Sequence, residues 1–128
     1  MRLLLDTQIA VWWQIDSRSV PAAARKLVLE TEGPVYLSRG SLWELAIKAS
    51  IGRLKLDLPK FCERVAEDGF QWLDISQEHL LAVARLPPQD EHKDPFDRLL
   101  VAQSLTEPLI LLTADSKLAR YGSTVRVV

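Results

Sequence analysis

Cysteine is almost absent from the 128-residue sequence, and this absence excludes several kinds of site. Cys62 is the only cysteine, so the chain can form no internal disulfide bond. One cysteine and two histidines also cannot supply the four ligands of a usual tetrahedral zinc site. The expected location is therefore a reducing cytoplasm.

The sequence also lacks an excess of charge of either sign: it has 16 basic and 17 acidic residues, and its net charge is -1. A strongly basic surface, the simplest indication of nucleic-acid binding, is therefore excluded, and a polyanionic substrate would need a local basic rim or metal ions. The apolar runs are too short to span a membrane, and Asp6 interrupts the stretch where a signal peptide would be apolar. The composition is that of an ordinary globular protein, and we expect a single domain over residues 1–128.

Short runs of Leu, Ile and Val alternate with helical patterns along the chain. Because these runs are continuous rather than alternating with polar residues, they favour a three-layer α/β fold, with a mostly parallel central sheet and helices on both faces. The expected strands are Arg2–Leu5, Val35–Ser38, Gln71–Ile75, Leu109–Thr113 and Thr124–Val127. The expected helices are Thr7–Ile15, Pro21–Thr31, Ser41–Ser50, Leu58–Asp68, Gln77–Leu86, Pro95–Leu105 and Ser116–Tyr121, with a polar loop before Asp94.

Acidic residues occur where these elements would meet at one edge of the sheet. Asp6 ends the first strand, and Asp115 follows the strand Leu109–Thr113. Glu44 and Asp97 are expected in the first turns of their helices. In a parallel sheet all four positions arrive at the carboxyl edge, where open α/β sheets bind their ligands.

Carboxylates gathered at one edge repel one another unless a cation neutralises them. Oxygen donors without histidine or cysteine suit Mg²⁺ or Mn²⁺. Such ions hold phosphate oxygens, lower the pKa of a bound water and stabilise charge on a leaving oxygen. The sequence therefore indicates metal-assisted hydrolysis of a phosphodiester.

Each acid also has a structural interpretation that involves no chemistry. Ser41 and Glu44 have the spacing of a capping box, in which Glu44 would bind only backbone N–H groups. Asp115 and Asp6 are placed to cap the short helices that follow them. Asp97 would be a favourable charge in the first turn of its helix.

The stretch HKDPFDRLL, residues 92–100, places two aspartates around a proline. Asp94 fits an N-cap before a proline in the first helical position. Asp97 shares a helical face with apolar residues three and four positions later, so it faces inward. We predict that Asp94 starts the helix and Asp97 does chemistry, and we leave open whether Asp94 and His92 also belong to the site.

Four motifs occur in the order LLLDT, SLWELAIK, HKDPFDRLLVAQSL and LLTADSKLARYG. This ordered set resembles the PIN-domain ribonucleases, and most of all the VapC-type toxins of bacterial toxin–antitoxin pairs. The similarity extends over Arg2–Val128. It implies a PIN-like fold and a Mg²⁺- or Mn²⁺-dependent endoribonuclease that acts on RNA, usually forms a homodimer and is held inactive by a cognate antitoxin protein.

The resemblance maps the acidic cluster of the family, with its metal-binding and catalytic roles, onto Asp6, Glu44, Asp97 and Asp115. Thr7 and Thr113 resemble the hydroxyl residues beside the acids, where they would orient a carboxylate or a metal-bound water; packing at the strand ends explains them equally well. Lys48 is spaced either to pair with Glu44 or to hold a phosphate. Arg98 is a candidate for bidentate phosphate binding.

Two other functions fit parts of the sequence. A non-catalytic α/β protein-binding module, a degenerate PIN-like domain, would use the acids only as helix caps. An aspartyl phosphotransfer enzyme would need a second acid beside the first strand, but Thr7 and Gln8 follow Asp6. The sequence indicates neither the RNA target nor the identity of the antitoxin.

Overall fold

A five-stranded parallel sheet forms the centre of the computed structural model, which describes residues 1–88 and 94–128. The strand order is β3-β2-β1-β4-β5, and each neighbouring pair runs parallel. The strands are β1 (Leu3–Leu5), β2 (Val35–Ser38), β3 (Gln71–Leu73), β4 (Ile110–Thr113) and β5 (Val125–Val127). Because the chain proceeds from β1 toward β3 and then returns to β4 on the other side of β1, the strand order reverses between β1 and β4.

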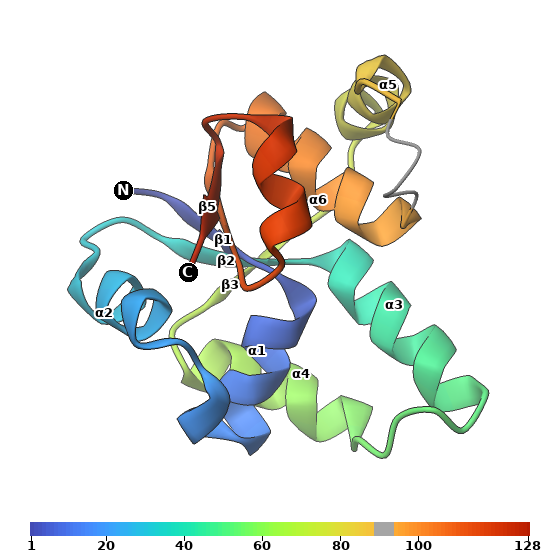
Figure 1. Ribbon diagram of the computed structural model, residues 1–128. Helices are drawn as coiled ribbons and strands as arrows, with labels where there is room; N and C mark the ends of the chain where they lie inside the picture. The colour runs from blue at the N-terminus through green and yellow to red at the C-terminus, as the bar shows by residue number, and fades with distance from the viewer. Residues whose placement is uncertain (89–93) are drawn as a thin grey trace.

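Helices cover both faces of this sheet (Figure 1). The helices are α1 (Thr7–Ile15), α2 (Ala22–Glu30), α3 (Arg39–Ser50), α4 (Leu58–Glu67), α5 (Gln77–Arg85) and α6 (Pro95–Thr106), with 3-10 helices η1 (Ser17–Ser19) and η2 (Ser116–Tyr121). In Figure 1 α1, α2 and α4 lie below the sheet, and α5, α6 and η2 lie above it. The predicted three-layer α/β fold is therefore confirmed. In the described part of the chain, no helix has the length and apolar character needed to cross a membrane.

Strand β1 shows why the apolar runs of the sequence are continuous. Leu3 and Leu5 belong to the apolar cluster shared with α1, α2 and α4, whereas Leu4 belongs to the cluster shared with α5 and α6. All three side chains are fully buried. Successive residues of a strand point to opposite faces, so a strand covered on both faces needs an apolar residue at every position.

The start of α3 corrects one interpretation of the sequence. The helix begins at Arg39 rather than Ser41, because the Ser38 hydroxyl accepts a hydrogen bond from the Gly40 backbone N–H at 2.9 Å. Glu44 therefore lies in the second turn of α3, and the predicted capping box with Ser41 is wrong. Because Glu44 does not cap the start of α3, its carboxylate is available for contacts with other parts of the protein.

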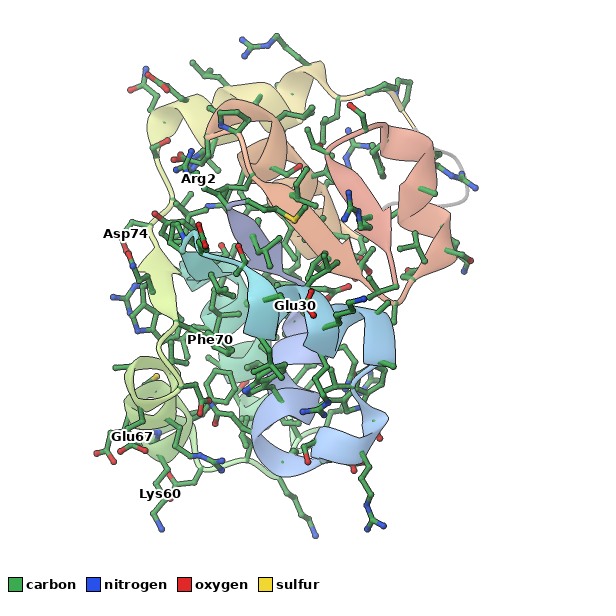
Figure 2. The ribbon with its side chains drawn as sticks, turned by 90° about the vertical axis from the view of Figure 1, so that its left-hand side faces the viewer. Arg2, Glu30, Lys60, Glu67, Phe70 and Asp74 are labelled. Atoms are coloured by element: carbon green, nitrogen blue, oxygen red, sulfur yellow. The ribbon has the colours of Figure 1, made fainter. Side chains whose placement is uncertain are left out.

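Other boundaries differ by less. Pro21 is the N-cap of α2 rather than its first residue. Strand β3 ends at Leu73 instead of Ile75, because it pairs only with β2, which ends opposite Leu73 at Ser38. Figure 2 looks toward the amino-terminal edge of the sheet, where Arg2 and Phe70 precede β1 and β3.

Helices α3 and α6 approach each other closely at Gly40. A Cβ atom on Gly40 would lie 2.5 Å from Cδ2 of Leu99 and 3.2 Å from the Ser38 Oγ. Real Cβ atoms do not approach other atoms to 2.5 Å, so the absence of a side chain permits this contact. Because Glu44 and Asp97 lie on these two helices, the Gly40 contact helps to set how close they come.

We predict that Gly40→Ala destabilises the protein by about 1–3 kcal/mol through overpacking against Leu99. An unhindered Gly→Ala change in a helix would instead stabilise by about 0.5–1 kcal/mol. Urea unfolding of the single variants and of Gly40→Ala/Leu99→Ala measures the effect. In the Leu99→Ala background the Gly40→Ala change should be neutral or stabilising, and an equal loss in both backgrounds would contradict the contact.

Candidate active site

Asp6 and Asp115 meet where the strand order of the sheet reverses. Asp6 directly follows β1, and its backbone N–H donates to the Leu112 carbonyl of β4 at 2.9 Å. The Thr113 hydroxyl, at the end of β4, donates to the Asp6 Oδ2 at 2.5 Å and accepts from the Asp115 N–H at 3.0 Å. Thr113 is fully buried and lies between the two acids. Open α/β sheets bind ligands at such a reversal point.

Both aspartates also cap helices. The Asp6 Oδ1 accepts from the Gln8 N–H at 3.3 Å, and the Asp115 Oδ1 accepts from the Lys117 N–H at 2.9 Å. The capping interpretation is therefore confirmed as geometry for both residues. It does not exclude a ligand, because a carboxylate has two oxygens and about four acceptor positions. The caps fix the direction in which each carboxylate points.

Glu44 reaches this edge from α3. Its side chain is only 12% exposed, and its Oε2 lies 2.9 Å from the Nζ of Lys48. Both residues line a cavity of about 140 Å³ together with Asp6 and Thr7. The structure therefore brings Glu44 and Lys48 to the same hollow as Asp6.

Thr7 connects the helix after β1 to the helix after β2. Its hydroxyl donates to the Ser41 Oγ at 2.7 Å, and both side chains are buried. This bond holds the start of α1 against α3, which carries Glu44. Ser41 is a supporting residue that the sequence reasoning missed, because its spacing to Glu44 indicated a cap and its true partner is distant in sequence.

Asp94 takes the capping role predicted for it at the start of α6. The Asp94 Oδ1 accepts from the N–H groups of Phe96 and Asp97 at 2.8 and 3.2 Å, so Asp94 is the N-cap. Asp97 is the third residue of the helix and is partly buried. His92 and Lys93, which precede Asp94, lie outside the described residues.

The pKa of Asp97 is raised from its ordinary value of 3.8 to about 7. Burial is the main cause, because a desolvated carboxyl group favours its neutral form. The charges of Asp6, Asp94, Glu44 and Asp115 raise this pKa further. Such coupling requires these carboxylates to lie near one another, so the predicted convergence of acids at this edge has electrostatic support.

The pKa of Asp6 is also raised, again mainly by burial. The hydrogen bonds from Thr113 and from the Gln8 N–H lower it, while the charges of Glu44 and Asp115 raise it. Asp6 therefore lies in the same repulsive field as Asp97.

The charges of the carboxylates interact, but their oxygens do not surround a common position that could hold an ion. Across residues 1–88 and 94–128, no three acidic, histidine or cysteine side chains are close enough together to hold a metal ion as they stand. These observations agree, because charges interact over longer distances than the 2.0–2.6 Å of metal–oxygen bonds. The oxygen-only donor set is of the kind that suits Mg²⁺ or Mn²⁺, and these side chains would have to move closer together to hold an ion.

Arg98 has contacts of a different kind. Its guanidinium donates to the carbonyls of Leu86 and Pro87 at 3.4 and 3.0 Å, and to the Tyr121 hydroxyl at 3.1 Å. These bonds tie the start of α6 to the end of α5 and to η2. They make Arg98 a supporting residue of the fold around Asp97, and they give no support to the predicted phosphate contact.

Comparison with known proteins agrees with this geometry. Residues 3–123 match the PIN domain. The chain belongs to the PIN-domain family. It is 27% identical to the protein named ribonuclease VapC22 from Mycobacterium tuberculosis, over 93% of this chain and 91% of that protein. The resemblance seen in the sequence motifs is therefore confirmed.

Solved structures show the same PIN-domain fold. VapBC2 from Rickettsia felis, described as bound to a DNA fragment from its promoter, has a TM-score of 0.73 at 18% identity and covers 100% of this chain and 98% of that chain. DNA-bound VapBC from Salmonella typhimurium has a TM-score of 0.69 at 17% identity, with 100% and 97% covered. At these identities the likeness establishes the fold alone.

We predict that Asp97→Asn stabilises the metal-free protein more at pH 8 than at pH 5. The folded state holds a proton on Asp97 up to a pKa of about 7, whereas an ordinary Asp releases it near 3.8. In wild type the folded state therefore loses stability as the pH rises from about 4 to about 7. Asn removes this loss, because it carries no charge.

Melting temperatures in EDTA at pH 5 and pH 8 measure the difference between Asp97→Asn and wild type. Asp57→Asn is the matched control, because Asp57 is an exposed N-cap of α4 and Asn also caps helices. An Asp97→Asn protein that melts below wild type at pH 8 would show that the carboxylate stabilises the fold.

Proposed function

We propose that this PIN-domain protein is a Mg²⁺- or Mn²⁺-dependent endoribonuclease and the toxin of a toxin–antitoxin pair. The observation that carries the proposal is the gathering of acids at the reversal point of the sheet, where Thr113 joins Asp6 to Asp115 and Glu44 lines the same cavity as Asp6. The charges of these acids also act on Asp97. The relative named ribonuclease VapC22 supports a nuclease that acts on RNA.

The residues proposed to hold the ion are the catalytic carboxylates Asp6, Glu44, Asp97 and Asp115. When bound, the ion supplies a water of lowered pKa and stabilises negative charge on the leaving oxygen. Thr113 holds one oxygen of Asp6 at 2.5 Å, and the Thr7–Ser41 bond holds α3 in place. With a pKa of about 7, Asp97 must release its proton before its carboxylate can serve as a ligand near neutral pH.

The proposed substrate is a phosphodiester of RNA held by a local basic rim. The net charge is -1, so the positive charge must be local. Lys48 lines the cavity beside Asp6 and Glu44, and Lys117 follows Asp115 in η2. The proposed protein partner is an antitoxin that holds the nuclease inactive in the cytoplasm, as suggested by the VapBC assemblies that share the fold.

A homodimer is proposed from an exposed apolar stripe on α3. Trp43, Ile47 and Ile51 recur at helical spacing and are 58%, 38% and 62% exposed. Trp43 also contacts Phe96 of α6 at a ring-centroid distance of 5.1 Å, so the stripe adjoins the helix that carries Asp97. Exposed apolar stripes of this kind are typical of protein interfaces, and a second copy of the same stripe would cover it in a two-fold dimer.

The alternative function is a non-catalytic binding module. It is favoured by the helix caps that Asp6 and Asp115 form, because capping alone would account for both residues. In that case the acids would bind no metal ion. Calorimetric titration of the protein with Mn²⁺ separates the two functions before any RNA is added.

We predict that the purified protein cleaves single-stranded RNA with Mn²⁺ and stops in EDTA. Asp97→Asn should lower the rate by more than about a hundredfold, because a metal ligand is lost. Asp94→Asn is the matched control and should retain most activity, since Asn caps a helix about as well as Asp. An active Asp97→Asn with an inactive Asp94→Asn would reverse the two assignments, and cleavage that persists in EDTA would exclude the metal mechanism.

We predict that Ile51→Glu converts the homodimer to a monomer, because a charge cannot be buried without a partner. Light scattering after size-exclusion chromatography measures the mass at the same concentration for all variants. Leu29→Glu, at a 68% exposed leucine of α2, is the control and should remain dimeric. A monomeric wild type, or an Ile51→Glu dimer, would contradict the proposed interface.

A further inference from the structure

Lys48 provides the counter-charge of Glu44 in the metal-free protein. The two side chains lie on one face of α3 at the i, i+4 spacing, with 2.9 Å between the Nζ and the Oε2. Glu44 is only 12% exposed, whereas Lys48 is 49% exposed. A largely buried carboxylate without a partner would be unfavourable, so Lys48 offsets part of the cost of burying Glu44.

The ammonium group binds an oxygen of a carboxylate that is proposed to hold the ion. Glu44 and Lys48 line the cavity of about 140 Å³ together with Asp6, Thr7, Val11 and Leu54. The oxygen that Lys48 binds therefore belongs to a carboxylate that lines the same cavity as Asp6. An ammonium and a divalent ion cannot both neutralise the same carboxylate oxygen at full strength.

We propose that Lys48 and the divalent ion compete for Glu44, and that binding of the ion releases the Lys48 ammonium to bind a phosphate of the RNA. This inference rests on the proposed nuclease function. A lysine ammonium is a compact charge on a flexible four-carbon stem, so it can leave Glu44 and reach a neighbouring phosphate without movement of the helix.

The exchange gives Lys48 two opposite effects. Without RNA it weakens metal binding, because the ion must displace it from Glu44. With the ion in place it strengthens RNA binding, because it is free for a phosphate contact. A lysine that only stabilised α3 would have neither effect.

The first test is calorimetric titration of Mn²⁺ into the protein without RNA at pH 8. Lys48→Met should bind Mn²⁺ about two- to fivefold more tightly than wild type, the range expected for loss of such an ion pair. Lys48→Arg keeps the charge and should stay near wild type. Lys60→Met is the control, since Lys60 projects from α4 away from the body of the molecule (Figure 2) and should leave the affinity unchanged.

The second test is the salt dependence of the interaction with a single-stranded RNA oligonucleotide. In saturating Mn²⁺, the slope of log KM against log salt concentration should fall by about one for Lys48→Met, because one phosphate contact is lost. In EDTA, where Lys48 remains on Glu44, fluorescence anisotropy should show the same slope for Lys48→Met and wild type. Equal melting temperatures of the variants exclude a folding defect.

The outcomes separate this inference from the proposed function. If Lys48→Met binds Mn²⁺ as wild type does, or more weakly, the competition for Glu44 is excluded while the nuclease function stands. If Mn²⁺ binding tightens but the salt slope in Mn²⁺ is unchanged, the release of Lys48 to a phosphate is excluded. If wild type binds no Mn²⁺, the inference and the metal mechanism both fail.

Discussion

The repulsion between carboxylates held at one edge of a parallel sheet is the constraint on which the rest of the site depends. Adjacent parallel strands β1 and β4 bring Asp6 and Asp115 together, and the hydrogen bonds through Thr113 keep them there. The acids of α3 and α6 cannot retreat freely, because these helices pack closely at Gly40. The fold therefore concentrates negative charge that a cation can neutralise. The pKa of Asp97 is raised mainly by burial and then by the charges of the neighbouring acids.

Local helix capping and the proposed chemistry use the same side chains. Asp6 and Asp115 cap α1 and η2 with one oxygen each, and these bonds orient the carboxylates toward the edge of the sheet. Lys48 neutralises Glu44 in a similar way, with an ion pair inside α3. The PIN domain thus holds its acids in place through hydrogen bonds and an ion pair, which offset part of the repulsion between them.

The layers, the parallel sheet and the N-cap of α6 at Asp94 followed from the sequence, because each leaves a pattern among neighbouring residues. Continuous Leu runs require burial on both faces, and a proline after Asp94 marks an N-cap. The start of α3 did not follow, because Ser38 ends β2 and also caps α3, whereas the spacing of Ser41 and Glu44 indicated a later start. The role of Ser41 did not follow, because the Thr7–Ser41 bond joins residues 34 positions apart. Arg98 shows the same limit, since the carbonyls and the hydroxyl that it binds come from other elements of the fold.

The central claim is that the four acids form one divalent-ion site. Anomalous diffraction from a crystal grown with Mn²⁺ tests it most directly, because Mn²⁺ is located without reference to any assumed ligand. The account predicts an anomalous peak at the carboxyl edge, within bonding distance of oxygens of Asp6 and Asp97 and with Glu44 turned away from Lys48. A peak elsewhere, or none in a crystal of protein that cleaves RNA, would contradict it.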